Sequence, residues 1–191
     1  MATIALYFGS FNPIHNGHVE VADTIANNEI IPIDKVFVIP SPQNPFKDFD
    51  SLAHYDHRAE MVNLATNMTK NIFICDIEKD NPPPNYTWDT LECLKKYYPN
   101  DTFYIVIGSD NYPRLSEWKN YDKIIAEYRF FVVMRDGDDL SHIESEKFIC
   151  LPQVTPMSST EIREKIKKGE SVEHLIPRAV DNYIKKEKLY I

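Results

Sequence analysis

The sequence predicts an α/β fold, with a doubly wound, mostly parallel sheet that carries helices on both faces. Short apolar runs alternate along the chain with stretches in which apolar residues recur every three or four positions. Several runs are apolar at consecutive positions, which is typical of strands buried on both sides. The 191 residues are enough for one substantial core. We therefore expect one domain over residues 1–191, with residues 158–191 as its C-terminal helical part.

The composition is that of a soluble globular protein, since 43% of the residues are hydrophobic and 26% are charged. The formal net charge of −8 disfavours non-specific binding to nucleic acid or to a membrane surface. The three cysteines are far apart and form no C-x-x-C motif, so we expect reduced thiols. No apolar run approaches the roughly 18 residues of a membrane span, and no signal peptide is expected. We expect a cytoplasmic protein.

The first strand, the first helix and the turn between them form the central feature of the sequence. Residues 3–8 are apolar and predict a strand, and the apolar spacing over residues 19–26 predicts a helix. The turn between them, residues 9–18, has the sequence G-S-F-N-P-I-H-N-G-H. We expect Asn16 to be the N-cap of the helix. Gly9 has no Cβ and would let a ligand approach the backbone closely.

Two histidines, His15 and His18, lie three residues apart at the start of this helix, so they can face the same side. A helix N-terminus attracts anions through its N–H groups and its dipole. Together these features predict a polyphosphate site without a P-loop lysine. The alternatives are two structural histidines or a metal site, for which two histidines are too few ligands. The G-x-G-x-x-G and G-x-x-x-x-G-K-[ST] motifs of other nucleotide sites are absent.

The rest of the chain continues the alternation of strands and helices. Further strands are expected at residues 35–39, 71–77, 102–107, 129–134 and 147–151. Further helices are expected at residues 57–67, 87–98 and 115–118, after residue 158, and around residues 179–184. His54 and His57 are expected at the surface. Residues 80–86 are rich in proline and predict a stiff loop, whereas residues 140–146 give no interpretable pattern.

Candidate ligand residues follow several of these strands. In open α/β sheets, ligands bind at the carboxyl ends of the strands. Lys47, after the second strand, is a candidate cation there, although a solvated loop lysine is the alternative. Gly108 and Asp110 follow an apolar strand, where a carboxylate can bind ribose hydroxyls or a metal-bound phosphate; a helix cap is the alternative for Asp110. Trp118 could stack on a flat ring or belong to the core.

Two further helix N-termini can hold anions. One begins near Thr87, where a carboxylate or phosphate could bind. The other begins at Ser158 or Ser159, either of which can cap the helix, with Glu161 or Glu164 completing a capping box. Arg163 is expected in the first turn, where the helix dipole disfavours a cation. A phosphate bound there would remove this conflict, so we predict a second phosphate site.

Two distant motifs give a resemblance to a known superfamily. Residues 9–18 resemble the T/H-x-G-H signature of the nucleotidyltransferases, and residues 158–163 (S-S-T-E-I-R) are similar to their S-S/T-x-I-R triphosphate-binding element. Residues 86–91, 107–118 and 176–190 look like bacterial nicotinate-nucleotide adenylyltransferases. The resemblance implies a Rossmann-like nucleotidyltransferase fold. It also implies AMP transfer from ATP to nicotinate mononucleotide, with Mg²⁺ carried by the ATP phosphates and with no metal held by the protein alone.

The resemblance also implies roles for individual residues. His18 and His15 would be catalytic. ATP would contact Gly9, Ser10, Phe11, His15, Gly17, His18, Gly108, Asp110, Ser158, Ser159 and Arg163. The acceptor would contact Asn44, Lys47, Tyr86, Thr87 and Trp118.

The chain departs from the family pattern at a few positions. The family usually has Gly-Gly-Thr-Phe-Asp-Pro at residues 8–13, and it often has His in place of Phe46. Nicotinamide mononucleotide and phosphopantetheine therefore stay open as acceptors, and a non-catalytic nucleotide sensor is the alternative from another class. The helix N-terminus near Thr87 favours the carboxylate of nicotinate. The sequence leaves open whether the protein is a homo-oligomer.

Overall fold

A computed structural model describes residues 1–43, 52–67, 69–134, 146–152 and 155–191. Six strands form one sheet: β1 (Thr3–Gly9), β2 (Lys35–Pro40), β3 (Ile72–Ile74), β4 (Thr102–Gly108), β5 (Arg129–Val133) and β6 (Phe148–Leu151). Their order is β3-β2-β1-β4-β5-β6, and every neighbouring pair is parallel. The chain therefore winds outward from β1 in both directions, and the strand order reverses between β1 and β4, where such sheets bind ligands.

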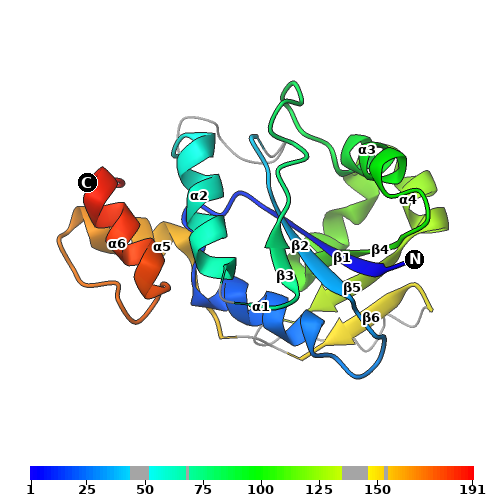
Figure 1. The fold of residues 1–191 in the computed structure, drawn as a ribbon, viewed down its shortest axis with the longest axis horizontal. Coiled ribbons are helices and arrows are strands. Elements are labelled where there is room, and N and C mark those ends of the chain that lie inside the picture. The colour runs from blue at the N-terminus through cyan, green and yellow to red at the C-terminus, as the bar shows by residue number, and fades with distance from the viewer. Residues whose placement is uncertain (44–51, 68, 135–145, 153–154) are drawn as a thin grey trace.

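Helices cover both faces of the sheet. They are α1 (Asn16–Ala26), α2 (Tyr55–Thr66), α3 (Thr87–Tyr97), the 3₁₀ helix η2 (Ser109–Glu117), α4 (Tyr121–Glu127), α5 (Ser159–Lys167) and α6 (Arg178–Glu187). Figure 1 shows α1 and α2 on one side of the sheet and α3 and α4 on the other. The predicted doubly wound α/β fold is confirmed, and the described strands are all parallel.

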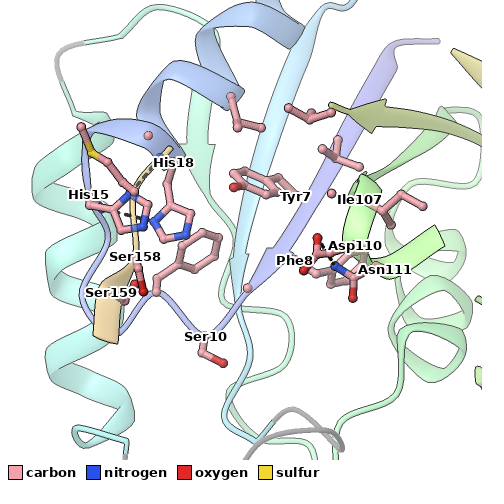
Figure 2. Close-up of a pocket in the computed structure, with 18 of the residues that line it drawn as sticks. Tyr7, Phe8, Ser10, His15, His18, Ile107, Asp110, Asn111, Ser158 and Ser159 are labelled. Atoms are coloured by element: carbon pink, nitrogen blue, oxygen red, sulfur yellow. Dashed lines mark hydrogen bonds between the residues drawn. The ribbon is translucent and has the colours of Figure 1, made fainter. Parts of the chain in front are cut away.

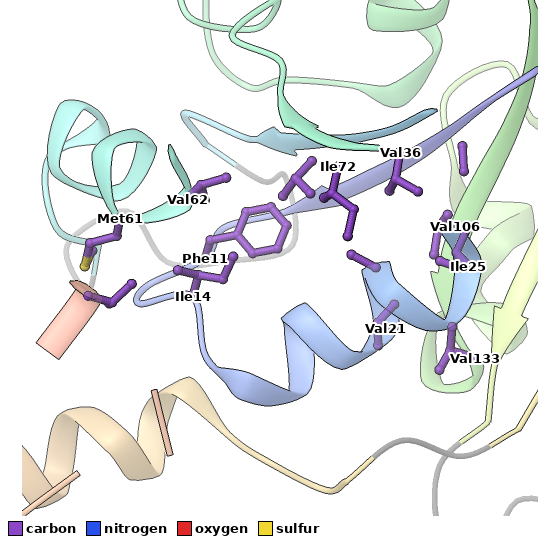
Figure 3. Close-up of a cluster of buried hydrophobic side chains, with 14 of the residues drawn as sticks. Phe11, Ile14, Val21, Ile25, Val36, Met61, Val62, Ile72, Val106 and Val133 are labelled. Atoms are coloured by element: carbon purple, nitrogen blue, oxygen red, sulfur yellow. The ribbon is translucent and has the colours of Figure 1, made fainter. Parts of the chain in front are cut away.

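The two faces are filled by separate hydrophobic clusters because successive strand residues point to opposite sides. Ile4 and Leu6 of β1 pack with Leu94 of α3 on one face. Ala5, between them, packs with Val21 of α1 on the other face, and Figure 3 shows that cluster. All five side chains are at most 6% exposed, so β1 is buried on both sides, as its apolar sequence predicts.

The C-terminal helices share the core of the sheet domain. Ile162 of α5 and Ile184 of α6 belong to the same hydrophobic cluster as Val21. On α6, the Tyr183 hydroxyl lies 2.9 Å from Nδ1 of His57 on α2. His57 is therefore half-buried in a helix contact, not at the surface as the sequence suggested.

Several element boundaries differ from the prediction. The expected strand over residues 71–77 is shorter, and the expected helix at residues 115–118 is the end of the longer η2. The sequence did not predict α4, because Ile124 is its one fully buried residue and a single position gives no period. Helix α2 begins two residues early, capped by Nδ1 of His54, which accepts from Asp56 N. No helix in the described ranges is long and apolar enough to cross a membrane.

Core packing gives a first prediction. Leu94 is fully buried between α3 and the sheet, and Leu94→Ala should lower the free energy of unfolding by about 2–5 kcal/mol. Tyr97, on the same helix, is 72% exposed, and Tyr97→Ala should change it by less than about 0.5 kcal/mol. Urea titrations of both variants measure this difference, and equal losses would contradict this assignment of the core.

Candidate active site

One large cavity lies beside the 9–18 turn, with a volume of about 820 Å³. All of the expected ATP residues line it: Gly9, Ser10, Phe11, His15, Gly17, His18, Gly108, Asp110, Ser158, Ser159 and Arg163. Figure 2 shows His15 and His18 on one side of it and Asp110 and Asn111 on the other, with Tyr7 between. These residues come from three distant parts of the chain and meet where the sheet order reverses.

The expected acceptor residues are only partly placed. Thr87 and Trp118 line the large cavity, and they also line a smaller one of about 80 Å³ together with Tyr86. Asn44 and Lys47 lie outside the described residues, as does Phe46. The two cavities share lining residues, so the described part of the acceptor side adjoins the ATP side.

His15, not Asn16, is the N-cap of α1, which corrects the sequence prediction. Its backbone is extended, and its Nδ1 accepts a hydrogen bond from His18 N at 3.3 Å. In return, Nδ1 of His18 accepts from His15 N at 3.2 Å. These reciprocal bonds make a capping box from two histidines. Asn16 is the first helical residue, and its side chain donates to His174 O.

These hydrogen bonds determine which ring nitrogen carries the proton. A neutral imidazole accepts at one nitrogen and donates at the other, so both rings carry their hydrogen on Nε2. The rings are stacked, with their centroids 3.6 Å apart. Burial lowers the pKa of His15 to about 4, so this ring is neutral at pH 7. The turn therefore presents oriented imidazole N–H donors in place of a lysine charge.

Both glycines of the turn lie in close packing. A Cβ at Gly9 would lie 2.7 Å from the Phe11 ring, and a Cβ at Gly17 would lie 3.1 Å from Thr155 O. The space beside Gly9, which we expected to admit a ligand, is thus occupied by Phe11. That ring makes an edge contact with the His18 ring at 5.1 Å. The glycines shape the turn and so help to orient the histidines.

Helix α5 is joined directly to the 9–18 turn. Ser158 is its N-cap but makes no side-chain capping bond, and the expected capping box with Glu161 or Glu164 does not form. The Ser159 hydroxyl instead donates to Pro13 O at 3.0 Å. Arg163 lies in the second turn, not the first, and its Nη1 donates to Asn12 O at 2.8 Å. Hydrogen bonds between the 9–18 turn and α5 thus link the two expected phosphate sites.

Asp110 lies on the opposite wall from the histidines. It is in the first turn of η2, whose N-cap position is Gly108, so the alternative that Asp110 caps this helix is wrong. Its Oδ1 accepts from Asn111 Nδ2 at 3.3 Å. Among the described residues that line the cavity, Asp110 supplies the carboxylate.

The acceptor side combines aromatic rings with a helix N-terminus. Tyr86 is the N-cap of α3 and makes no side-chain capping bond. Lys119 forms an ion pair with Asp89 at 2.7 Å, and its Nζ lies 4.9 Å from the centre of the Tyr86 ring. Trp118, next to Lys119, lines both cavities. An aromatic surface thus lies beside backbone N–H groups that can bind an anion.

One buried residue near the site, Arg58 of α2, was not among the residues predicted from the sequence. Its side chain is 1% exposed and donates to four main-chain carbonyls. A signal was present, because Arg58 precedes Met61 and Val62 by three and four positions and therefore lies on the apolar face of the helix. A charged residue in an apolar stripe usually has a specific partner.

The burial of His15 predicts a pH-dependent stability. Its pKa is about 4 in the folded protein and 6.5 when exposed, so the unfolded chain alone binds a proton between these values. The contribution of His15 to the free energy of unfolding is fully present above pH 6.5. It falls by about 1.4 kcal/mol per pH unit as the pH drops toward 4. His15→Asn keeps a capping acceptor but does not titrate there. Urea titrations at several pH values give the free energy of unfolding as a function of pH, and this dependence should be weaker for the variant. Equal pH dependence in both proteins would refute the lowered pKa of His15.

Known proteins resemble this chain over nearly its whole length. The sequence profile of the cytidylyltransferase-like family matches residues 6–165. A Cytophaga hutchinsonii protein named "Probable nicotinate-nucleotide adenylyltransferase" is 36% identical over 98% of this chain and 97% of its own length. A Flavobacterium psychrophilum protein of the same name is 38% identical over 98% of each chain.

A solved structure is also similar, that of Plasmodium falciparum nicotinic acid mononucleotide adenylyltransferase complexed with NaAD. It is 27% identical and has a TM-score of 0.84, over 100% of this chain and 98% of that chain. Sequence and fold agree, and the chain belongs to the nicotinate-nucleotide adenylyltransferases of the cytidylyltransferase-like family.

Proposed function

We propose that this enzyme transfers AMP from ATP to nicotinate mononucleotide, giving nicotinate adenine dinucleotide and pyrophosphate, a step of NAD biosynthesis in the cytoplasm. The observation that carries the proposal is one cavity that joins the histidine turn and the α5 N-terminus to the wall of Thr87 and Trp118. The half that we assign to the ATP phosphates thus faces an aromatic half. The names of the relatives and the NaAD complex of the Plasmodium enzyme support the same acceptor.

The ATP half would gather positive potential locally, since the whole chain has a net charge of −8. Two helix N-termini, of α1 and α5, would face the triphosphate. Arg163 lines the same cavity and supplies a permanent charge. The buried Ser10 hydroxyl has no hydrogen-bond partner among the described residues and can donate to a phosphate oxygen. The adenylate ribose would bind near Asp110.

The chemistry requires no general base. A phosphate oxygen of nicotinate mononucleotide, already anionic, attacks the α-phosphorus of ATP and forms the new P–O bond. The bond from the α-phosphorus to the bridging oxygen breaks, and pyrophosphate leaves with that electron pair. Catalysis is therefore positioning together with stabilisation of charge on the transferred group. His18 Nε2–H would donate to the α- or β-phosphate, and His15 would assist.

We propose that Mg²⁺ enters with ATP. Magnesium at nucleotide sites is held mainly by substrate phosphates, with one or two carboxylates from the protein. Among the described residues no group of three or more His, Cys, Asp or Glu could form a protein-only site, and Asp110 is the carboxylate of the described cavity wall. The ion would neutralise phosphate charge as the leaving group departs.

The acceptor half would select a flat, negatively charged base. Trp118 would stack on the pyridine ring, with Tyr86 and Thr87 beside it and with Asn44 and Lys47 contacting the nucleotide. The N-terminus of α3 favours the carboxylate of nicotinate over the neutral amide of nicotinamide. Phosphopantetheine has no flat ring at this end, so the aromatic wall disfavours it.

The reaction and the acceptor can be tested together by pyrophosphate release with ATP and Mg²⁺. Nicotinate mononucleotide, nicotinamide mononucleotide and phosphopantetheine are compared at equal concentration. We expect release with nicotinate mononucleotide at a much higher kcat/KM than with the other two. A preference for another acceptor would overturn the assignment of Thr87 and Trp118, and ATP binding without release would favour a nucleotide sensor.

His18→Ala should lower kcat about a hundredfold or more, because it removes a donor to the transferred phosphate. His174→Ala, which removes an exposed histidine, is the matched control and should leave kcat unchanged. Steady-state pyrophosphate release measures both variants. A His18→Ala enzyme with a raised KM for ATP and an unchanged kcat would argue against a role in the transition state.

Trp118→Ala should raise KM for nicotinate mononucleotide about tenfold or more, since stacking of a base on an aromatic ring is worth about 1–3 kcal/mol. Trp118→Phe retains a ring and should recover most of this loss. KM for ATP should change little in both variants. If KM for ATP rises instead, Trp118 belongs to the ATP half and the proposed orientation of the substrates is wrong.

A further inference from the structure

Arg58 is a buried cation that contacts main-chain carbonyls rather than an acid. Its Nη1 donates to Ser10 O at 2.8 Å and to Ser41 O at 2.7 Å. Its Nη2 donates to Pro42 O at 2.9 Å, and its Nε donates to Ala53 O at 2.9 Å. Arginine stays protonated in proteins, so this charge persists although burial lowers the pKa. No carboxylate in the described part of the chain accepts from it.

The four carbonyls belong to three separate segments around the cavity. Ser10 is in the turn that follows β1, which lines the ATP half. Ser41 and Pro42 directly follow β2, and Ala53 lies two residues before α2. The planar guanidinium presents several donors in a fixed fork, so it holds these segments at defined mutual distances. A lysine ammonium has three donors on a flexible stem and cannot reproduce this geometry.

On the ATP side, the contact orients a peptide group of the turn. The Ser10–Phe11 peptide is trans and planar, so the Phe11 N–H points opposite to the Ser10 carbonyl that faces Arg58. The Phe11 N–H has no hydrogen-bond acceptor within the described chain. A charged donor on the carbonyl polarises the peptide and strengthens its N–H as a donor. This N–H belongs to a residue that lines the ATP half.

Arg58 is also connected by hydrogen bonds to the acceptor wall. Pro42 O accepts from Arg58, and the next N–H, of Gln43, donates to Asn85 Oδ1 at 3.1 Å. Asn85 N donates back to Gln43 O at 3.0 Å. Asn85 precedes Tyr86, the N-cap of α3. A continuous set of hydrogen bonds thus runs from the ATP turn through Arg58 to the acceptor wall.

We infer that Arg58 is a positioning residue that sets the ATP turn and the acceptor wall at the distance required for in-line transfer. It touches neither substrate and acts through the Ser10–Phe11 peptide and the Gln43–Asn85 pair. The inference rests on the proposed function, which assigns the two walls to the two substrates. In-line attack is sensitive to placement, and an error of about 1 Å can cost about a hundredfold in rate.

The first test is kinetic and uses Arg58→Lys, which keeps the charge and loses the planar fork. We expect kcat to fall about a hundredfold, while the Kd of each substrate measured alone changes much less. Val62→Ala is the matched control, because Val62 is a fully buried residue of the same helix whose apolar side chain cannot hydrogen-bond to the carbonyls that Arg58 binds. The Val62→Ala variant should be less stable than the wild-type protein. Its kcat, measured at a temperature well below its unfolding temperature, should be unchanged. A folded Arg58→Lys enzyme with nearly normal kcat would overturn the inference.

The second test monitors the 9–18 turn by NMR in the absence of catalysis. The Phe11 amide resonance of ¹⁵N-labelled protein is followed while pyrophosphate is added. In the wild-type protein it should shift at saturation, and in Arg58→Lys the shift should be much smaller. An unchanged resonance in the wild-type protein would overturn the role of the Ser10–Phe11 peptide. This readout needs no acceptor, so failure of nicotinate mononucleotide as a substrate would refute the proposed function separately.

Discussion

The site depends on the parallel pairing of β1 with both β2 and β4. This pairing places three carboxyl ends at one edge of the sheet, with the order reversing beside β1. The histidine turn follows β1, two of the four carbonyls that Arg58 binds follow β2, and the Asp110 wall follows β4. Each segment is short, and none could form the cavity alone. The hydrophobic clusters on the two faces hold the strands in register and thereby hold the walls together.

An acidic protein that binds ATP must concentrate donors locally, and this one does so with few charges. His15 is neutral because it is buried, and it exchanges reciprocal hydrogen bonds between main-chain N–H and ring Nδ1 with His18. Arg163 and Arg58 add permanent charge, but both also hold backbone carbonyls near the turn. The turn is therefore oriented before any ligand binds. Preorganised donors of this kind stabilise developing charge without reorganisation during the reaction.

The sequence determined much of this protein by itself. Consecutive apolar runs specified buried parallel strands, since only those positions avoid water on both faces. The spacing of His15 and His18 predicted that both rings face the same side, and they stack with centroids 3.6 Å apart. The S-S-T-E-I-R motif predicted the start of a helix far along the chain, and α5 begins at Ser159. These features are local: each follows from residue type and spacing within one turn or one helix. The same is true of Thr87, which begins α3 as expected.

Tertiary structure decided the features that depend on partners distant in sequence. His15 caps α1, whereas Asn16 is bound by a distant segment. The main-chain N–H of Asn16 donates to Leu175 O, and its side-chain amide donates to His174 O. The function of Arg58 depends on four carbonyl partners that lie outside α2. No pattern within α2 predicts which carbonyls these are. Ser159 bonds to Pro13 rather than capping its own helix. Spacing along the chain constrains neighbours in a helix, whereas contacts between segments are set by how the sheet brings its strand ends together.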